Sequence, residues 1–160
     1  MDKWEIFKKE IKYLLAEENN HDAIKKKWKV IKNKFNNYVP NHLLLLFKKI
    51  EEQNNKNIKI LDHGCGGGAT ILFLVSKGYH NVWGIDISDT TYFKLNSKKI
   101  NNVLKIIIGE SSLKVRAYDG KKIPFKDNFF NVIFSQQVIE HVQENFWEYY
   151  LSEEKRALKE

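Results

Sequence analysis

Residues 58–88 read IKILDHGCGGGATILFLVSKGYHNVWGIDIS, and this stretch decides the fold class. A short apolar run ends at Asp62, and a turn that contains four glycines follows. An apolar segment of helical length comes next, and a second apolar run, residues 82–85, ends at Asp86. The order strand, tight turn, helix, strand and acid is the layout of a nucleoside-binding βαβ unit.

Each part of this unit has a physical role in holding a ligand. Glycines let the backbone turn sharply and approach a ligand closely. A helix that begins near Ala69 directs its free N–H groups and its positive dipole end toward that ligand. The Asp86 carboxylate can accept hydrogen bonds from both hydroxyls of a ribose. Gly64, Gly66 and Ala69 also satisfy the dinucleotide pattern G-x-G-x-x-A, so the glycine spacing alone leaves the ligand open.

Four motifs in series resemble the class I S-adenosylmethionine-dependent methyltransferases, in particular their small-molecule, type 11-like branch. They are LDHGCGGG (61–68), GIDIS (84–88), DGKKIPF (119–125) and VIEHV (138–142). The resemblance covers residues 58–160 and implies an α/β fold with a Rossmann-like, doubly wound sheet. It also implies an enzyme that uses S-adenosyl-L-methionine to methylate an oxygen, nitrogen or carbon atom of a small-molecule acceptor.

The resemblance implies where the cofactor binds. The residues that match the family's positions are Asp62, Gly64, Cys65, Gly66, Gly68 and Gln136 for the methionine end, Asp86 for the ribose, and Ile87, Asp119 and Gly120 for the adenine. Asp119 also fits a plain Asp-Gly turn, which remains an alternative. Residues 135–138, SQQV, differ from the (D/N)PPY motif of DNA amino-methyltransferases, which argues against adenine or cytosine amino methylation.

The catalytic candidates are His141 and Glu140. A general base is optional in methyl transfer, and His141 is the best candidate because imidazole titrates near neutrality. Gln137, Glu140 and His141 have i, i+3, i+4 spacing and resemble the E-x-x-E-H metal site of some family members. Gln137 supplies no anionic ligand, so we favour a Glu-His pair that packs against the cofactor pocket and predict no metal site.

Composition limits the class of protein. The chain has 160 residues, of which 42% are hydrophobic, and one cysteine, Cys65, which forms no internal disulfide. Cys65 then reads as a small residue in a tight turn, and the charged first ten residues do not resemble a signal peptide, so we expect a cytoplasmic protein with no membrane span. The formal charge is +7, but only Arg116 and Arg156 are arginines, which argues against a nucleic-acid partner.

Apolar spacing predicts helices within residues 4–15 and 24–35, and Asn41 is expected to cap a third helix that ends near Ile50. We divide the chain into a helical cap segment, 1–56, and the cofactor-binding domain, 57–160. The expected strands are 58–62, 82–87, 113–118 and 131–135, with helices from 69 to 77, around 100–108 and from 144 onward. In the family, N-terminal helices pack over the cofactor cleft; they could also simply cover one face of the sheet.

The chain stops at RALKE, where members of the family continue through a turn into three further strands. With the family's strand order, strand four would form an apolar edge, which is a pairing liability. We expect a fragment of a longer protein; an edge covered by a second copy or another partner, and a compact variant, are the alternatives. Two other functions remain open: a nicotinamide-binding oxidoreductase domain, and a catalytically silent partner of a full-length methyltransferase.

Overall fold

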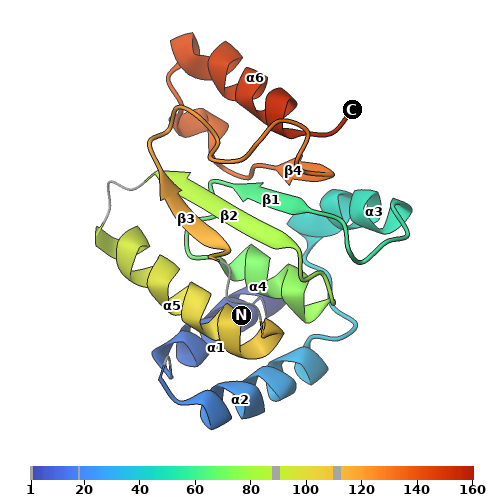
Figure 1. Ribbon diagram of the computed structural model, residues 1–160. Helices are drawn as coiled ribbons and strands as arrows, with labels where there is room; N and C mark the ends of the chain where they lie inside the picture. The colour runs from blue at the N-terminus through green and yellow to red at the C-terminus, as the bar shows by residue number, and fades with distance from the viewer. Residues whose placement is uncertain (1, 18, 88–90, 110–112) are drawn as a thin grey trace.

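The computed structural model describes residues 2–17, 19–87, 91–109 and 113–160. Figure 1 shows a parallel sheet with helices on both sides. The helices are α1 (Lys3–Ala16), α2 (His21–Lys34), α3 (Leu44–Glu52), α4 (Ala69–Ser76), α5 (Thr91–Ile108) and α6 (Trp147–Ala157), with 3₁₀ turns at Asn41–Leu43, Ile139–His141 and Glu144–Phe146. The strands are β1 (Ile60–His63), β2 (Val82–Ile87), β3 (Val115–Tyr118) and β4 (Val132–Phe134). Ser88, the last residue of the GIDIS motif, lies outside the described residues.

The four strands lie in the order β3-β2-β1-β4, and every neighbouring pair is parallel. This confirms the predicted α/β fold with a Rossmann-like sheet and its expected strand order. The register pairs Asp62 with Gly84 and Ile87 with Tyr118, so the carboxyl ends of β1, β2 and β3 meet at one edge of the sheet. In open α/β sheets, ligands bind at this edge.

The two faces of the sheet pack into two different cores. Along β1, Ile60 joins the larger core with α4 and the N-terminal helices, whereas Leu61 joins a smaller core with Trp83 and Phe130. This alternation follows from the pleat of a strand, since successive side chains point to opposite faces. His63 therefore lies on the same face as Leu61, the face that α6 covers (Figure 1).

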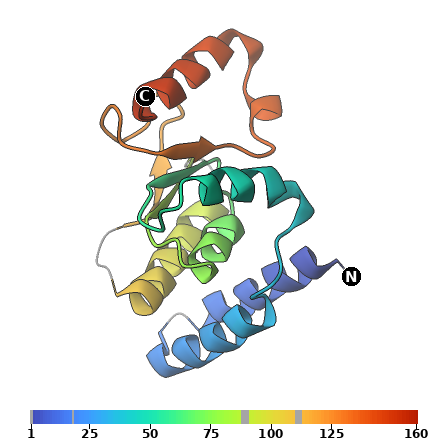
Figure 2. The ribbon, with the colours of Figure 1, turned by 90° about the vertical axis from the view of Figure 1, so that its right-hand side faces the viewer.

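The N-terminal helices form an outer layer against α4 and α5 (Figures 1 and 2). Phe7 of α1 is fully buried, with its ring edge-on to Phe35 and Phe73 at centroid distances of 5.1 and 5.6 Å. The outer layer and the sheet layer consequently share one hydrophobic core. Of the two readings of these helices, the structure supports the one in which they cover one side of the sheet.

Three local expectations were wrong. Asn41 does not cap a helix: it is the first residue of a 3₁₀ turn whose preceding residue is Pro40, and no side chain caps that turn. The VIEHV segment was expected to be helical, but it forms only the short turn Ile139–His141. Gln137 before that turn has φ +54°, so residues 137, 140 and 141 do not share a helix face.

The edge strand β4 is partly covered by the end of the chain. Leu158 forms a parallel bridge with Phe130, and Lys159 N–H donates to the Phe130 carbonyl oxygen at 2.8 Å. No described strand pairs with the outer side of Val132–Phe134. Separately, none of the helices in the described part of the chain has the length and apolar character needed to cross a bilayer.

Candidate functional site

A cavity of about 490 Å³ opens at the carboxyl ends of β1, β2 and β3. Its lining comes from three groups: Gly64, Gly66, Asp86, Ile87 and Gly120 at the strand ends; Gln137, Val138, His141 and Val142 after β4; and the rings of His63, Tyr118, Phe146, Tyr149 and Tyr150. Cofactor pockets in proteins commonly have volumes of roughly 300–1,000 Å³ and a mainly apolar lining with a few placed polar groups.

The glycine loop has the geometry that a close ligand requires. Gly64 has φ +90° and Gly66 has φ +46°, a region that residues with a Cβ rarely adopt. A Cβ built on Gly66 would meet no atom within 4 Å, so the backbone of this residue faces open space. The loop is held to β2 by Gly64 N–H and Cys65 N–H, which donate to the Ile85 carbonyl oxygen at 2.8 and 3.1 Å.

Asp86 connects the end of β2 to this loop. Its Oδ2 accepts from Gly66 N–H at 2.7 Å, and its Oδ1 accepts from Ile87 N–H at 2.8 Å. Because each carboxylate oxygen can accept more than one hydrogen bond, both oxygens keep acceptor capacity toward the cavity. The same contacts fix the direction of the carboxylate, so it is positioned to bind a pair of hydroxyl groups.

Asp62 and Cys65 lie behind the loop and do not line the cavity. Asp62 is only 4% exposed, and burial, together with the nearby Asp86 charge, raises its pKa to about 8. Burial raises the pKa of the Cys65 thiol well above its ordinary value, and the nearby Asp62 and Asp86 charges add to this. A protonated, buried thiol is a poor nucleophile, which fits the reading of Cys65 as a small residue in a tight turn. Gly68 is the N-cap of α4 and has φ +70°.

Three further predicted residues lie around the rim. Ile87 lines the cavity and is exposed, as expected for a residue beside an adenine ring. Asp119 is exposed and accepts from Lys121 N–H at 2.9 Å, as in a plain Asp-Gly turn, whereas its neighbour Gly120 lines the cavity. Gln136 is turned toward the N-terminal segment, because its Nε2 donates to the His42 carbonyl oxygen at 3.1 Å.

The segment after β4 folds over the glycine loop. A Cβ on Gly64 would lie 2.2 Å from Cγ2 of Val138, so this valine packs directly against the glycine. His141 lines the cavity, but Glu140 does not, so the two catalytic candidates are separated by the turn. Among the described residues, no group of three or more histidine, cysteine or acidic side chains is arranged to hold a metal ion.

Sequence reasoning missed the aromatic wall of the cavity. His63 is 2% exposed, and its ring stacks on that of Tyr150 with centroids 4.3 Å apart. Its ring nitrogens contact Glu154 of α6 and Tyr118 of β3. A histidine at the buried end of β1, directly before the glycine loop, was the one signal in the sequence that could have indicated this group.

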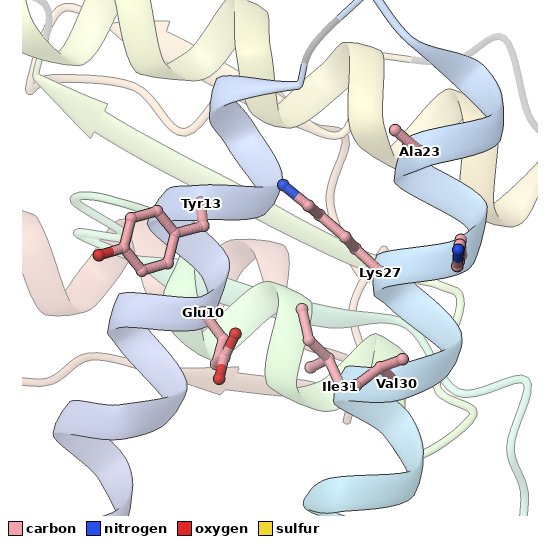
Figure 3. A pocket seen from close by; sticks show the side chains of 7 residues that line it. Glu10, Tyr13, Ala23, Lys27, Val30 and Ile31 are labelled. Carbon is pink, nitrogen blue, oxygen red and sulfur yellow. The ribbon is translucent and has the colours of Figure 1, made fainter.

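The N-terminal helices contribute no residue to the lining of this cavity. The expectation that they pack over the cofactor cleft is therefore wrong for this cavity. A separate hollow of about 440 Å³ lies between α1 and α2, where Tyr13, Lys27 and Val30 face one another across the two helices (Figure 3). Its lining contains no residue from the glycine loop or the strand ends, so we do not assign the site there.

The residues of the first cavity fit a nucleoside cofactor that carries an amino acid group. Exposed backbone at Gly66 and a fixed carboxylate at Asp86 lie in one cavity, and both are in hydrogen-bond contact with each other. The glycine backbone suits a chain that must lie close to it, and the carboxylate suits a ribose.

Comparison with known proteins identifies the family. The sequence model of a family described as "Methyltransferase domain" matches residues 61–160. An uncharacterized protein of Methanocaldococcus jannaschii is 31% identical over 116 residues, which are 71% of this chain and 42% of that protein. The chain thus spans less than half the length of this curated relative.

Solved structures show the same fold. A candidate sarcosine dimethylglycine methyltransferase from Galdieria sulphuraria aligns with a TM-score of 0.53 and 24% identity, over 72% of this chain and 42% of that one. An S-adenosylmethionine-dependent methyltransferase from Mesorhizobium loti aligns with a TM-score of 0.47 and 19% identity, over 64% and 43% of the two chains. Because the family match covers more than half of the sequence, the chain belongs to the methyltransferase-domain family of class I S-adenosylmethionine-dependent methyltransferases.

Proposed function

We propose that this chain binds S-adenosylmethionine in the cavity at the carboxyl ends of β1, β2 and β3, and that it methylates a small-molecule acceptor. The observation that carries the proposal is the pairing of Gly66 N–H with Asp86 at 2.7 Å, in a cavity that both residues line. This pairing holds an exposed backbone and an acceptor carboxylate in one fixed arrangement.

The chain's own residues supply binding and orientation. Asp86 would accept from the ribose hydroxyls, the backbone at Gly64 and Gly66 would hold the methionine end, and Ile87 with Gly120 would flank the adenine. The bound cofactor supplies an activated methyl group, so the protein mainly positions the acceptor and excludes water. His141 lines the same cavity and is the general-base candidate that the motif comparison suggests.

The acceptor is proposed to be a small molecule because the cavity is enclosed by side chains of this domain on the side of α6. The aromatic wall offers an apolar surface of the kind that binds compact ligands. The family match favours this function over a nicotinamide-binding oxidoreductase, although both would use a glycine loop and a strand-end acid.

Calorimetric titration with S-adenosylhomocysteine tests the proposal. We expect micromolar binding, roughly −8 kcal/mol, that Asp86→Ala weakens at least about tenfold through the lost hydrogen bonds to the ribose. Asp22→Ala serves as the matched control, since Asp22 lies in the first turn of α2, away from the cavity. Binding of NADH in place of S-adenosylhomocysteine by the folded chain would contradict the proposal.

A silent partner of a full-length methyltransferase, or a homodimer joined along β4, would leave a different trace. Either assembly would cover the outer side of Val132–Phe134. Size-exclusion chromatography with light scattering distinguishes these cases, because a monomer that binds S-adenosylhomocysteine needs neither.

A further inference from the structure

His63 lies at the centre of a chain of hydrogen bonds beside the cavity. Its Nδ1 is 2.8 Å from Oε1 of Glu154, and its Nε2 is 2.7 Å from the hydroxyl oxygen of Tyr118. The imidazole is almost completely buried and stacks on Tyr150 with an interplanar angle of 9°. The hydroxyl group of Tyr150 is in turn 2.9 Å from Oγ of Ser135. Both His63 and Tyr118 line the cavity, together with Gly64 and Gly66.

The partners of His63 determine where its proton lies. A carboxylate oxygen accepts hydrogen bonds, so the contact with Glu154 places the imidazole proton on Nδ1. Nε2 then carries a lone pair, and it accepts from the Tyr118 hydroxyl group. This arrangement of acid, imidazole and hydroxyl is the one in which an imidazole receives a proton from a hydroxyl while a carboxylate fixes its tautomer.

We propose that Tyr118 is a catalytic proton acceptor for methyl transfer and that His63 and Glu154 are the residues that position and relay the proton. This inference rests on the proposed function, and it specifies the acceptor as a molecule that reacts through an O–H or N–H group. The acceptor atom bonds to the methyl carbon, and the carbon–sulfur bond of the sulfonium breaks with its electron pair left on sulfur. The proton of the acceptor passes to Tyr118 Oη, and the Tyr118 proton passes to His63 Nε2.

The charges balance along this path. A sulfonium and a neutral acceptor become a neutral thioether, a methylated product and an imidazolium that faces the Glu154 carboxylate. Burial, followed by the nearby charges of Asp86, Asp119 and Glu154, raises the pKa of Tyr118 to about 12. A free tyrosinate is therefore unfavourable near neutral pH, and a transfer in which Tyr118 gains one proton as it releases another avoids that state.

Tyr118 is better placed for this role than His141. The His141 side chain is exposed, and no hydrogen bond of its imidazole is found among the described residues. The Tyr118 hydroxyl, by contrast, already contacts a buried base whose other nitrogen contacts an acid. A positioned proton acceptor of this kind contributes about 10²–10⁴ in rate.

The tautomer of His63 is the decisive measurement, and it needs no acceptor. Long-range ¹H–¹⁵N NMR of the labelled chain at pH 7 is expected to show a neutral His63 with its proton on Nδ1. Tyr118→Phe should shift the His63 Nε2 resonance while the proton stays on Nδ1, and Glu154→Gln should raise the population of the other tautomer. Tyr149→Phe and Glu148→Gln are the matched controls, with a cavity tyrosine and an exposed acid of α6, and they should leave the His63 signals in place. A proton on Nε2, or a charged imidazole at pH 7, would overturn the relay because Nε2 could then accept nothing from Tyr118.

A transfer assay forms the second arm. Methyl transfer from labelled S-adenosylmethionine to a panel of phenols, alcohols and amines is expected to be about 10²-fold slower or more in Tyr118→Phe. A wild-type rate in that variant, for any acceptor with an O–H or N–H group, would refute the role of Tyr118. Failure of the proposed function would look different: no binding of S-adenosylhomocysteine by calorimetry, whatever the His63 tautomer is.

Discussion

At the scale of single residues, Asp62 carries the most unusual protonation state of the loop. Burial and the Asp86 charge raise its pKa to about 8, whereas an aspartate in an unfolded chain titrates near about 4. Between these two values the folded protein binds more protons at this position than the unfolded chain. The free energy of unfolding therefore falls as the pH rises from about 4 to about 8.

Replacement of Asp62 by asparagine should remove this pH dependence. The amide has the shape of the protonated carboxyl group and cannot ionise, so we expect Asp62→Asn to gain about 2 kcal/mol over the wild type between pH 5 and pH 8. Urea unfolding of both proteins at the two pH values measures this gain. A difference in unfolding free energy that is equal at both values would show that Asp62 does not titrate in this range.

The two glycines Gly64 and Gly78 separate backbone strain from side-chain overlap. Their φ angles are +90° and +88°, but a Cβ on Gly64 would lie 2.2 Å from Val138, whereas a Cβ on Gly78 would meet no atom within 4 Å. We expect Gly78→Ala to destabilise the fold by about 1 kcal/mol through its φ angle alone. Gly64→Ala should add about 1–3 kcal/mol of overlap. Equal losses in thermal unfolding would mean that the segment after β4 moves away from the loop without difficulty.

At the scale of elements, Arg156 fastens α6 to the loop between β3 and β4. Its guanidinium group donates to the carbonyl oxygens of Ile123 and Phe125 at 2.9 and 3.0 Å. It also pairs with Glu153 at 2.7 Å, and this hydrogen bond lowers the pKa of the Glu153 carboxyl group. The aromatic wall of the cavity stands on α6, so this anchor holds the wall against the strand ends.

Loss of the Arg156 side chain should loosen α6. Arg156→Ala leaves a nearly buried Glu153 carboxylate and two carbonyl oxygens without their donor, so we expect a loss of about 3 kcal/mol in urea unfolding. Lys155→Ala, on the exposed side of the same turn, should change stability by less than about 0.5 kcal/mol. Comparable effects of the two substitutions would show that the guanidinium contacts contribute little.

The elements differ in how well the sequence indicated them. The apolar runs at β1 and β2 and the glycines between them are local signals, so the strand order and the loop with Asp86 could be predicted. The aromatic wall could not, because Tyr150 and Glu154 lie on an amphipathic helix, and the sequence does not say which strand end that helix meets. The helix expected at VIEHV failed for a local reason: Gln137 adopts φ +54°, which interrupts a helix before it begins.

At the scale of the whole molecule, the sheet separates two cores that carry different parts of the site. The larger core joins the N-terminal helices to the back of the glycine loop, and the smaller core lies beneath α6 and the aromatic wall. Strands β1 and β2 contribute to both cores through alternate residues. If the sheet couples the two cores, damage to the outer helices must reach the opposite side of the molecule.

Phe7→Ala tests this coupling. Phe7 is fully buried against Phe35 and Phe73, so its truncation should lower the free energy of unfolding by about 3–5 kcal/mol. Two reporters can follow the loss: Trp28, buried in the larger core, and Trp83, buried in the smaller one. In variants that keep only one of these tryptophans, both fluorescence signals should shift to the same lower urea midpoint, because one cooperative unit loses all its structure together. A Trp83 transition that stays at the wild-type midpoint while the Trp28 transition moves would instead mean that the outer helices unfold by themselves, and that residues downstream of them hold the cavity without their support.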